Sequence, residues 1–148
     1  MKTLAPSALL RRALLGDAAG SLDVAALQLA AAAPLAALTQ LPALLLAGSG
    51  LVMAVYGALL LLMARRTRLP RALVPAVIVG NVGWALGALL VGIQAAPALP
   101  GLALLAVHAL WTLLFAALQQ AGLSRSVPAA DQARGHNGAL DDATLHTR

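Results

Sequence analysis

Residues 43–71 read ALLLAGSGLVMAVYGALLLLMARRTRLPR, a charge-free run followed by a loop rich in arginine. A helix needs about 20 apolar residues to cross the hydrocarbon core of a bilayer, and this run has that length. Basic residues concentrate in the cytoplasmic loops of membrane proteins. The stretch therefore predicts a transmembrane helix that ends in a cytoplasmic loop. The arginines of this loop are Arg65, Arg66, Arg68 and Arg71.

The charge-free stretches on both sides of this loop predict four crossings. Residues 24–64 and 72–124 hold no Asp, Glu, Lys or Arg. Each stretch is too long for one crossing and suits two crossings joined by a turn. Pro42 breaks the first stretch, and Pro97 and Pro100 break the second, because proline lacks a backbone donor and disfavours helix before it. The expected helices cover 20–38, 43–64, 72–94 and 101–121.

Composition supports a chain whose surroundings are lipid. Hydrophobic residues make up 61% of the 148 positions and charged residues 10%, with a mean hydropathy of +0.87. Soluble domains are about 45–50% apolar and about 25% charged. We therefore expect an all-α integral membrane protein with one four-helix transmembrane domain over 20–121. The chain has no Cys, which excludes disulfides and thiolate metal sites, and we expect no metal or other cofactor.

The placement of basic residues predicts the orientation. Lys2, Arg11 and Arg12 precede the first span and Arg125 follows the last, whereas the turns near 40 and 97 carry no basic residue. Both termini and the arginine loop are therefore expected in the cytoplasm. The net charge of +5 is read as this orientation signal rather than as a nucleic-acid surface. Arg11, Arg12 and the loop arginines are candidates for contact with anionic lipid headgroups.

The two ends of the chain are expected to lie outside the bundle. Residues 1–19 suggest an amphipathic helix at the cytoplasmic interface, with Ser7 as its N-cap. The alternative is a cleaved signal peptide, although Asp17 and Asp23 would interrupt its apolar region. Residues 122–148 lack apolar periodicity and are expected to form a disordered tail.

Polar residues inside the spans are candidates for a ligand site, because burying them is costly. At about 1.5 Å per residue, Asn81 and His108 are expected near the midplane, where they could meet. These residues form either a polar track for a solute or hydrogen-bonded links between helices. Asp17 and Asp23 are expected at the cytoplasmic mouth of the first span, so no carboxylate is expected at mid-depth. The track candidates are Gln28, Tyr56, Asn81, His108 and Thr112.

Small and aromatic residues predict where the helices pack. Gly80, Gly83 and Gly87 form a smooth stripe on the third span, which allows close approach of another helix. Trp84 and Trp111 fall well inside their spans, away from the interfaces where tryptophan concentrates. We therefore expect all five residues to pack between helices.

Short motifs resemble a known set of proteins. Residues 10–18 (LRRALLGDA), the start of the arginine loop and residues 77–84 (VIVGNVGW) look like uncharacterised, small four-helix bacterial inner-membrane proteins. The resemblance covers about residues 9–121, and Asn81 with Trp84 is its most distinctive part. It implies a bacterial inner-membrane location and assigns no activity.

No catalytic motif is recognisable, since phosphate-binding loops, HExxH and GxSxG are missing from the sequence. We therefore expect a non-enzymatic accessory or scaffold subunit, or a self-associating bundle held by glycine-rich faces. The partners would be the bilayer and a second copy or a larger membrane complex. The alternative is an oligomeric channel or transporter for a small solute, with Gln28, Asn81 and His108 along its route. A membrane enzyme is the third option.

Overall fold

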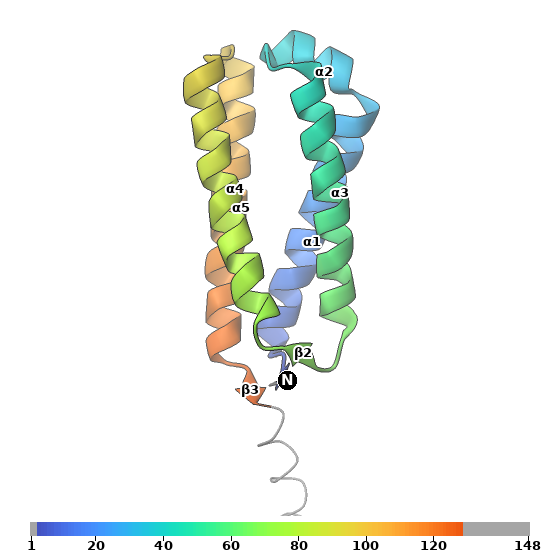
Figure 1. The fold of residues 1–148 in the computed structure, drawn as a ribbon, viewed down its shortest axis with the longest axis vertical. Helices are drawn as coiled ribbons and strands as arrows, with labels where there is room; N and C mark the ends of the chain where they lie inside the picture. The colour runs from blue at the N-terminus through green and yellow to red at the C-terminus, as the bar shows by residue number, and fades with distance from the viewer. Residues whose placement is uncertain (1–2, 129–148) are drawn as a thin grey trace, which may run out of the picture.

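The computed structural model describes residues 3–128 and is almost entirely helical (Figure 1). Four helices are long and apolar enough to span a membrane. The fifth helix, α2, is a short connector. The helices are α1 (Ala8–Ala30), α2 (Ala32–Thr39), α3 (Ala43–Arg65), α4 (Leu73–Ala95) and α5 (Leu99–Ser124). The strands are β1 (Thr3–Ala5), β2 (Leu69–Pro70) and β3 (Val127–Pro128).

The long helices form two pairs that meet along one side only. α1 packs against α3 and α4 packs against α5, and contacts between α1 and α5 join the pairs. Although α3 and α4 are consecutive in the chain, their backbones do not approach each other as those of the paired helices do. They meet through side chains: Leu60 and Val74 share a buried cluster, and the Tyr56 hydroxyl lies 2.9 Å from Asn81 Oδ1. The two pairs separate toward the end where α2 lies (Figure 1). The bundle is therefore closed at the α1–α5 seam and open between α3 and α4.

Three of the four expected spans are confirmed as helices with nearly the predicted bounds. The turns between them lie at the expected prolines. Gln40 and Ala96, the residues that end α2 and α4, adopt positive φ angles of 59° and 39°. Pro42 precedes α3, and Pro100 occupies the first turn of α5, where its missing N–H costs nothing.

The prediction for the first span was wrong. Residues 8–19 do not form a separate helix but continue to Ala30 as α1, with Ser7 capping its start as expected. The helix breaks at Ala31 instead. Pro34 explains the break, because its ring would clash with the carbonyl of Ala30 in a continuous helix. Asp17 thus lies near the middle of a 23-residue helix.

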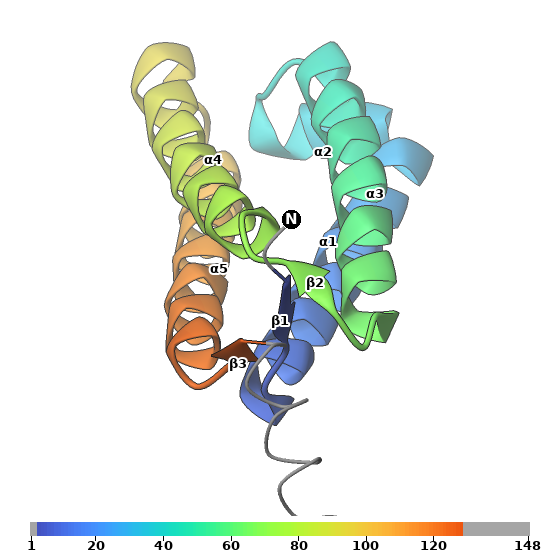
Figure 2. The ribbon, with the colours of Figure 1, turned by 60° about the horizontal axis from the view of Figure 1, so that its bottom comes forward.

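A small antiparallel sheet fastens three segments together at one end of the bundle. Its strand order is β2-β1-β3, so the segment before α1 lies between the α3–α4 connection and the segment after α5. Figure 2 shows these strands at the foot of both helix pairs. This sheet was not predicted from the sequence. The prediction of a disordered tail over 122–148 was wrong for its first residues, since α5 runs to Ser124 and β3 follows. Residues 129–148 lie outside the described part.

The close helix contacts do not fall on the glycines that the sequence suggested. A Cβ added at Gly80, Gly83 or Gly87 would meet nothing within 4 Å. In contrast, a Cβ at Gly57 would lie 2.8 Å from Leu22, and one at Gly122 2.6 Å from the backbone of Leu10. Within this chain, glycine therefore permits the approach of α3 and α5 to α1. The α4 glycines face open space instead.

Candidate functional site

A buried carboxyl group links all four long helices. The Asp17 side chain on α1 is 0% exposed. Its Oδ2 atom accepts hydrogen bonds from Gln119 Nε2 (2.7 Å), Asn81 Nδ2 (2.8 Å) and the Tyr56 hydroxyl (3.2 Å). Ser21, one turn further along α1, donates to Oδ1 at 3.5 Å. We call these five residues the Asp17 cluster.

One hydroxyl proton of the Asp17 cluster is shared between two acceptors. Tyr56 has a single hydroxyl proton, yet its oxygen lies 3.2 Å from Asp17 Oδ2 and 2.9 Å from Asn81 Oδ1. The amide protons of Asn81 are both used, on Asp17 and on Gln119 Oε1 (3.2 Å). The Tyr56 hydroxyl can therefore donate to Asp17 or to Asn81, but not to both at once.

The hydrogen-bond partners of Asp17 are all uncharged. The cluster residues contributed by α3, α4 and α5 are a phenol and two carboxamides. Among the described residues, every buried side-chain nitrogen and oxygen has a hydrogen-bond partner. An ionised Asp17 would therefore be solvated by dipoles alone, and a cation reaching the cluster would find an unpaired negative charge.

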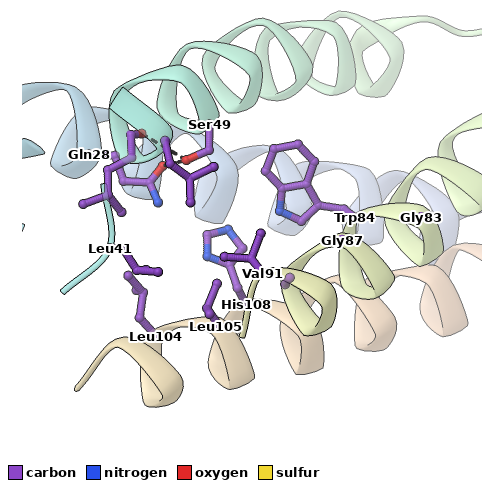
Figure 3. A pocket seen from close by; sticks show the side chains of 13 residues that line it. Gln28, Leu41, Ser49, Gly83, Trp84, Gly87, Val91, Leu104, Leu105 and His108 are labelled. Carbon is purple, nitrogen blue, oxygen red and sulfur yellow. Dashed lines mark hydrogen bonds between the residues drawn. The ribbon is translucent and has the colours of Figure 1, made fainter. Parts of the chain in front are cut away.

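Three cavities follow the space between α3 and α4. The first, about 280 Å³, lies toward the α2 end (Figure 3). Gln28, Ser49, Trp84 and His108 give it polar or aromatic groups, and most of the remaining wall is leucine, valine and glycine. The Ser49 hydroxyl donates to Gln28 Oε1 at 2.9 Å. His108 Nε2 lies 3.1 Å from the sulfur of Met53.

The second cavity, about 150 Å³, lies next to the Asp17 cluster. Ser21, Tyr56 and Asn81 form part of its wall, together with Thr112. Trp84 lines both this cavity and the first, so the two are neighbours. Because its own bonded partners form this wall, Asp17 is separated from the cavity by a single layer of side chains.

The third cavity, about 670 Å³, extends from the second toward the strands. It shares Tyr56 and Gly80 with the second cavity and reaches Arg66 and Arg68. The predicted glycine stripe of α4 lines this whole path: Gly80 borders the second and third cavities, and Gly83 and Gly87 border the first. We call the three cavities together the α3–α4 groove.

The structure brings the predicted track residues to this groove. Gln28 and His108 line the first cavity, while Tyr56, Asn81 and Thr112 line the second. The expected meeting of His108 and Asn81 is not found. Asn81 bonds to Tyr56 and Asp17, whereas His108 contacts Met53.

The two tryptophans differ in their surroundings. Trp84 lines the first and second cavities. Trp111 is 41% exposed, with its ring 4.9 Å from that of Phe115. A Cβ at Gly20 would meet the Trp111 ring, so Trp111 packs over α1 at the α1–α5 seam.

Asp17 and Gln119 were not predicted as site residues. Asp17 was expected at the mouth of the first span, whereas it lies buried near the middle of α1. A signal was present, since Leu10, Leu14, Asp17, Ser21 and Gln28 continue one buried stripe along α1 in steps of three, four and seven residues. Asp23 lies off this stripe and is exposed.

Comparison of the chain with family models, with curated proteins and with solved structures finds no match.

Proposed function

We propose that α1, α3, α4 and α5 cross a membrane, and that the protein carries a small, largely apolar cation in exchange for a proton on Asp17. The observation that supports this proposal is the position of Asp17, fully buried at the crossing of four helices and one layer of side chains from a groove. Ionisable groups inside a bilayer are expensive and mark proton or solute routes. This function corresponds to the transporter alternative of the sequence analysis.

A purely structural role for Asp17 explains less. Asn or Gln at position 17 would also link the helices by hydrogen bonds, without the cost of a buried ionisable group. What a carboxyl adds is the ability to gain or lose a proton. The cluster suits both states, because the Tyr56 hydroxyl can donate to Asp17 or to Asn81.

The walls of the groove favour a cation with an apolar body. Leucine, valine and glycine make up most of the first cavity, and Trp84 and Tyr56 offer ring faces that attract cations. When the solute binds, the proton leaves Asp17 and the solute's positive charge replaces it, so the net charge in the groove stays constant. Direct contact with the carboxyl requires Tyr56 and Asn81 to turn aside, which makes these two residues the gate of the site.

Trp84 provides a binding assay. In a Trp111→Phe background, Trp84 is the one remaining indole of the chain, so quenching by tetraphenylphosphonium reports on the groove. We expect the affinity to fall about tenfold for each unit of pH lowered, over the range in which free protein holds the proton. Asp17→Asn, which like protonated Asp17 carries no charge, should bind weakly and without this pH dependence. Asp23→Asn, a matched change at an exposed site on the same helix, should behave as wild type. Equal pH dependence in all three proteins would rule out exchange at Asp17.

Transport is tested separately in proteoliposomes. An acidic interior should drive uptake of ethidium through wild type and Asp23→Asn, but not through Asp17→Asn. Uptake in Asp17→Asn that responds to the proton gradient as strongly as in wild type would contradict the proposal.

Association with a partner or a second copy is a second candidate, supported by the outer face of α1. Arg12, Leu15, Ala19, Asp23 and Ala26 are exposed along one stripe of this helix. In a bilayer, Asp23 would lie roughly 18 Å along the helix axis from Arg11 and would face lipid tails at a cost of about 3 kcal/mol. A protein neighbour on this face would remove that cost. This support differs from the sequence expectation, which placed the contact on the α4 glycines.

The association candidate is tested by native mass in lipid discs. We expect Ala19→Phe combined with Asp23→Ala to reduce the assembly to single chains, because the pair alters the shape and polarity of the stripe. Val79→Phe, at an exposed position of α4, is the control. A mass equal to wild type in both variants would argue against this face.

A further inference from the structure

The third cavity combines a charged mouth with an apolar interior. Arg66 and Arg68 line it at the strand end, and both are exposed. Leu59, Leu62 and Leu73 line its length and are exposed by 54%, 56% and 42%. Such a wall suits a molecule with an anionic head and an apolar chain.

The small sheet fixes part of the wall of this cavity. β2 pairs with β1 through Thr3↔Pro70 and Leu4↔Leu69, and Leu69 is 1% exposed. The α3–α4 connection is thereby pinned across the foot of the bundle (Figure 2). The pinned connection forms one end of the cavity wall, to which it contributes Arg66, Arg68, Leu69 and Pro70.

The two arginines have no carboxylate neighbour within the described residues. Asp17 and Asp23 are the only acidic residues over 3–128, and both belong to α1. Asp17 is bonded inside its cluster and Asp23 lies on the exposed stripe of α1. An anionic group is therefore the complement that the mouth of the cavity lacks in this part of the chain.

The length of the cavity matches one leaflet of a bilayer. Its wall on α3 runs from Arg66 to Tyr56, ten residues or about 15 Å at the helical rise. The hydrocarbon core is about 30 Å thick, so one leaflet contributes about half of that. An acyl chain that starts at the arginines would end beside Tyr56 and Gly80, where the second cavity begins.

We propose that the third cavity binds an acidic phospholipid, with the headgroup phosphate on Arg66 and Arg68 and one acyl chain between α3 and α4. The inference rests on the proposed membrane insertion but not on transport by Asp17. The lipid would fill the strand-side half of the α3–α4 groove and leave the first and second cavities to the solute.

Native mass spectrometry of the full chain from lipid discs tests this site. From discs containing equal phosphatidylglycerol and phosphatidylcholine, wild type should retain phosphatidylglycerol. Arg66→Gln with Arg68→Gln should weaken retention by about tenfold or more, given the strength of basic residues near an anionic surface. Arg12→Gln with Arg125→Gln removes the same charge elsewhere and should retain the lipid as wild type does.

A second variant tests the acyl chain without changing charge. Ala76 lines the cavity and is exposed, so Ala76→Trp should fill the space and also release the lipid. Equal retention in the Arg66/Arg68 and Arg12/Arg125 variants would overturn the proposal, as would equal retention of phosphatidylcholine by wild type. The lipid result is independent of the solute assays, so failure of one proposal is distinguishable from failure of the other.

Discussion

The two ends of the bundle are built differently. At the strand end, Leu10, Leu14, Leu60 and Leu69 are at most 1% exposed and form one cluster with Val74. Toward the α2 end, the buried cluster between α4 and α5 consists of small side chains, and the first cavity of about 280 Å³ lies between the helix pairs. The strand end is thus tightly packed around α1 and fastened by the sheet, with the third cavity opening on its α3–α4 side. The other end has a small-residue core and the first cavity between the helix pairs. The Asp17 cluster lies between the two.

The largest effect on stability is expected at the Asp17 cluster itself. Asp17→Ala would leave the donors of Tyr56, Asn81 and Gln119 without their shared acceptor. Unsatisfied buried groups cost about 1–3 kcal/mol each, and some will find new partners. We expect the unfolding free energy in detergent to fall by about 3 kcal/mol, whereas Asp17→Asn should lose less than about 1 kcal/mol. Equal losses would show that the carboxyl, not the hydrogen bonding, holds the two pairs together.

A smaller effect is expected from truncating leucines at the two ends. Leu60→Ala, in the packed cluster, should cost about 2 kcal/mol. This is the low end of the range for core leucines, because in a bilayer the unfolded helix still keeps the side chain from water. Leu105→Ala, at the wall of the first cavity, should lower the free energy of unfolding by less than about 1 kcal/mol. Denaturation of both variants in detergent measures the two losses of unfolding free energy. A larger loss for Leu105→Ala than for Leu60→Ala would show that the α2 end is the more tightly packed.

The smallest effects on stability are expected at glycines. Replacement by Ala should destabilise the protein at the α1–α3 contact and stabilise it on the groove side of α4. Gly57→Ala would place a Cβ 2.8 Å from Leu22 at the α1–α3 contact, so we expect a loss of about 1 kcal/mol. Gly87→Ala adds a methyl group where nothing lies within 4 Å, and Ala favours helix over Gly by up to about 1 kcal/mol. Gly87→Ala should therefore raise the melting temperature. A fall at Gly87 would indicate that this face of α4 contacts another chain.

Much of the fold was predictable from the sequence because charge and proline mark the ends of apolar helices. Arg65 ends α3, and Pro42 and Pro100 lie at the starts of α3 and α5, which fixed these bounds well. The first span was misplaced because hydropathy treats Asp17 as an end signal. In the structure, hydrogen bonds from three other helices make Asp17 a core residue.

The site could be predicted only in part, because sequence gives the residues of a face but not the partner of that face. The polar positions Gln28, Asn81 and His108 were found from their depth. Which helices they would meet depended on α1 packing against α3 and α5, while α3 and α4 stay apart. For the same reason, Gly80, Gly83 and Gly87 suggested helix contact where they line the groove.

The position of β1 between β2 and β3 also has a consequence for synthesis of the chain. Of the three strands, β1 is made before the others. It can pair with β2 only after α3 has been made, and with β3 only after α5 is complete. Proteins are made at about 5–20 residues per second, so one edge of β1 waits for some seconds with unpaired backbone groups. The three-stranded sheet can therefore be completed only after all the helices between its strands have been synthesised.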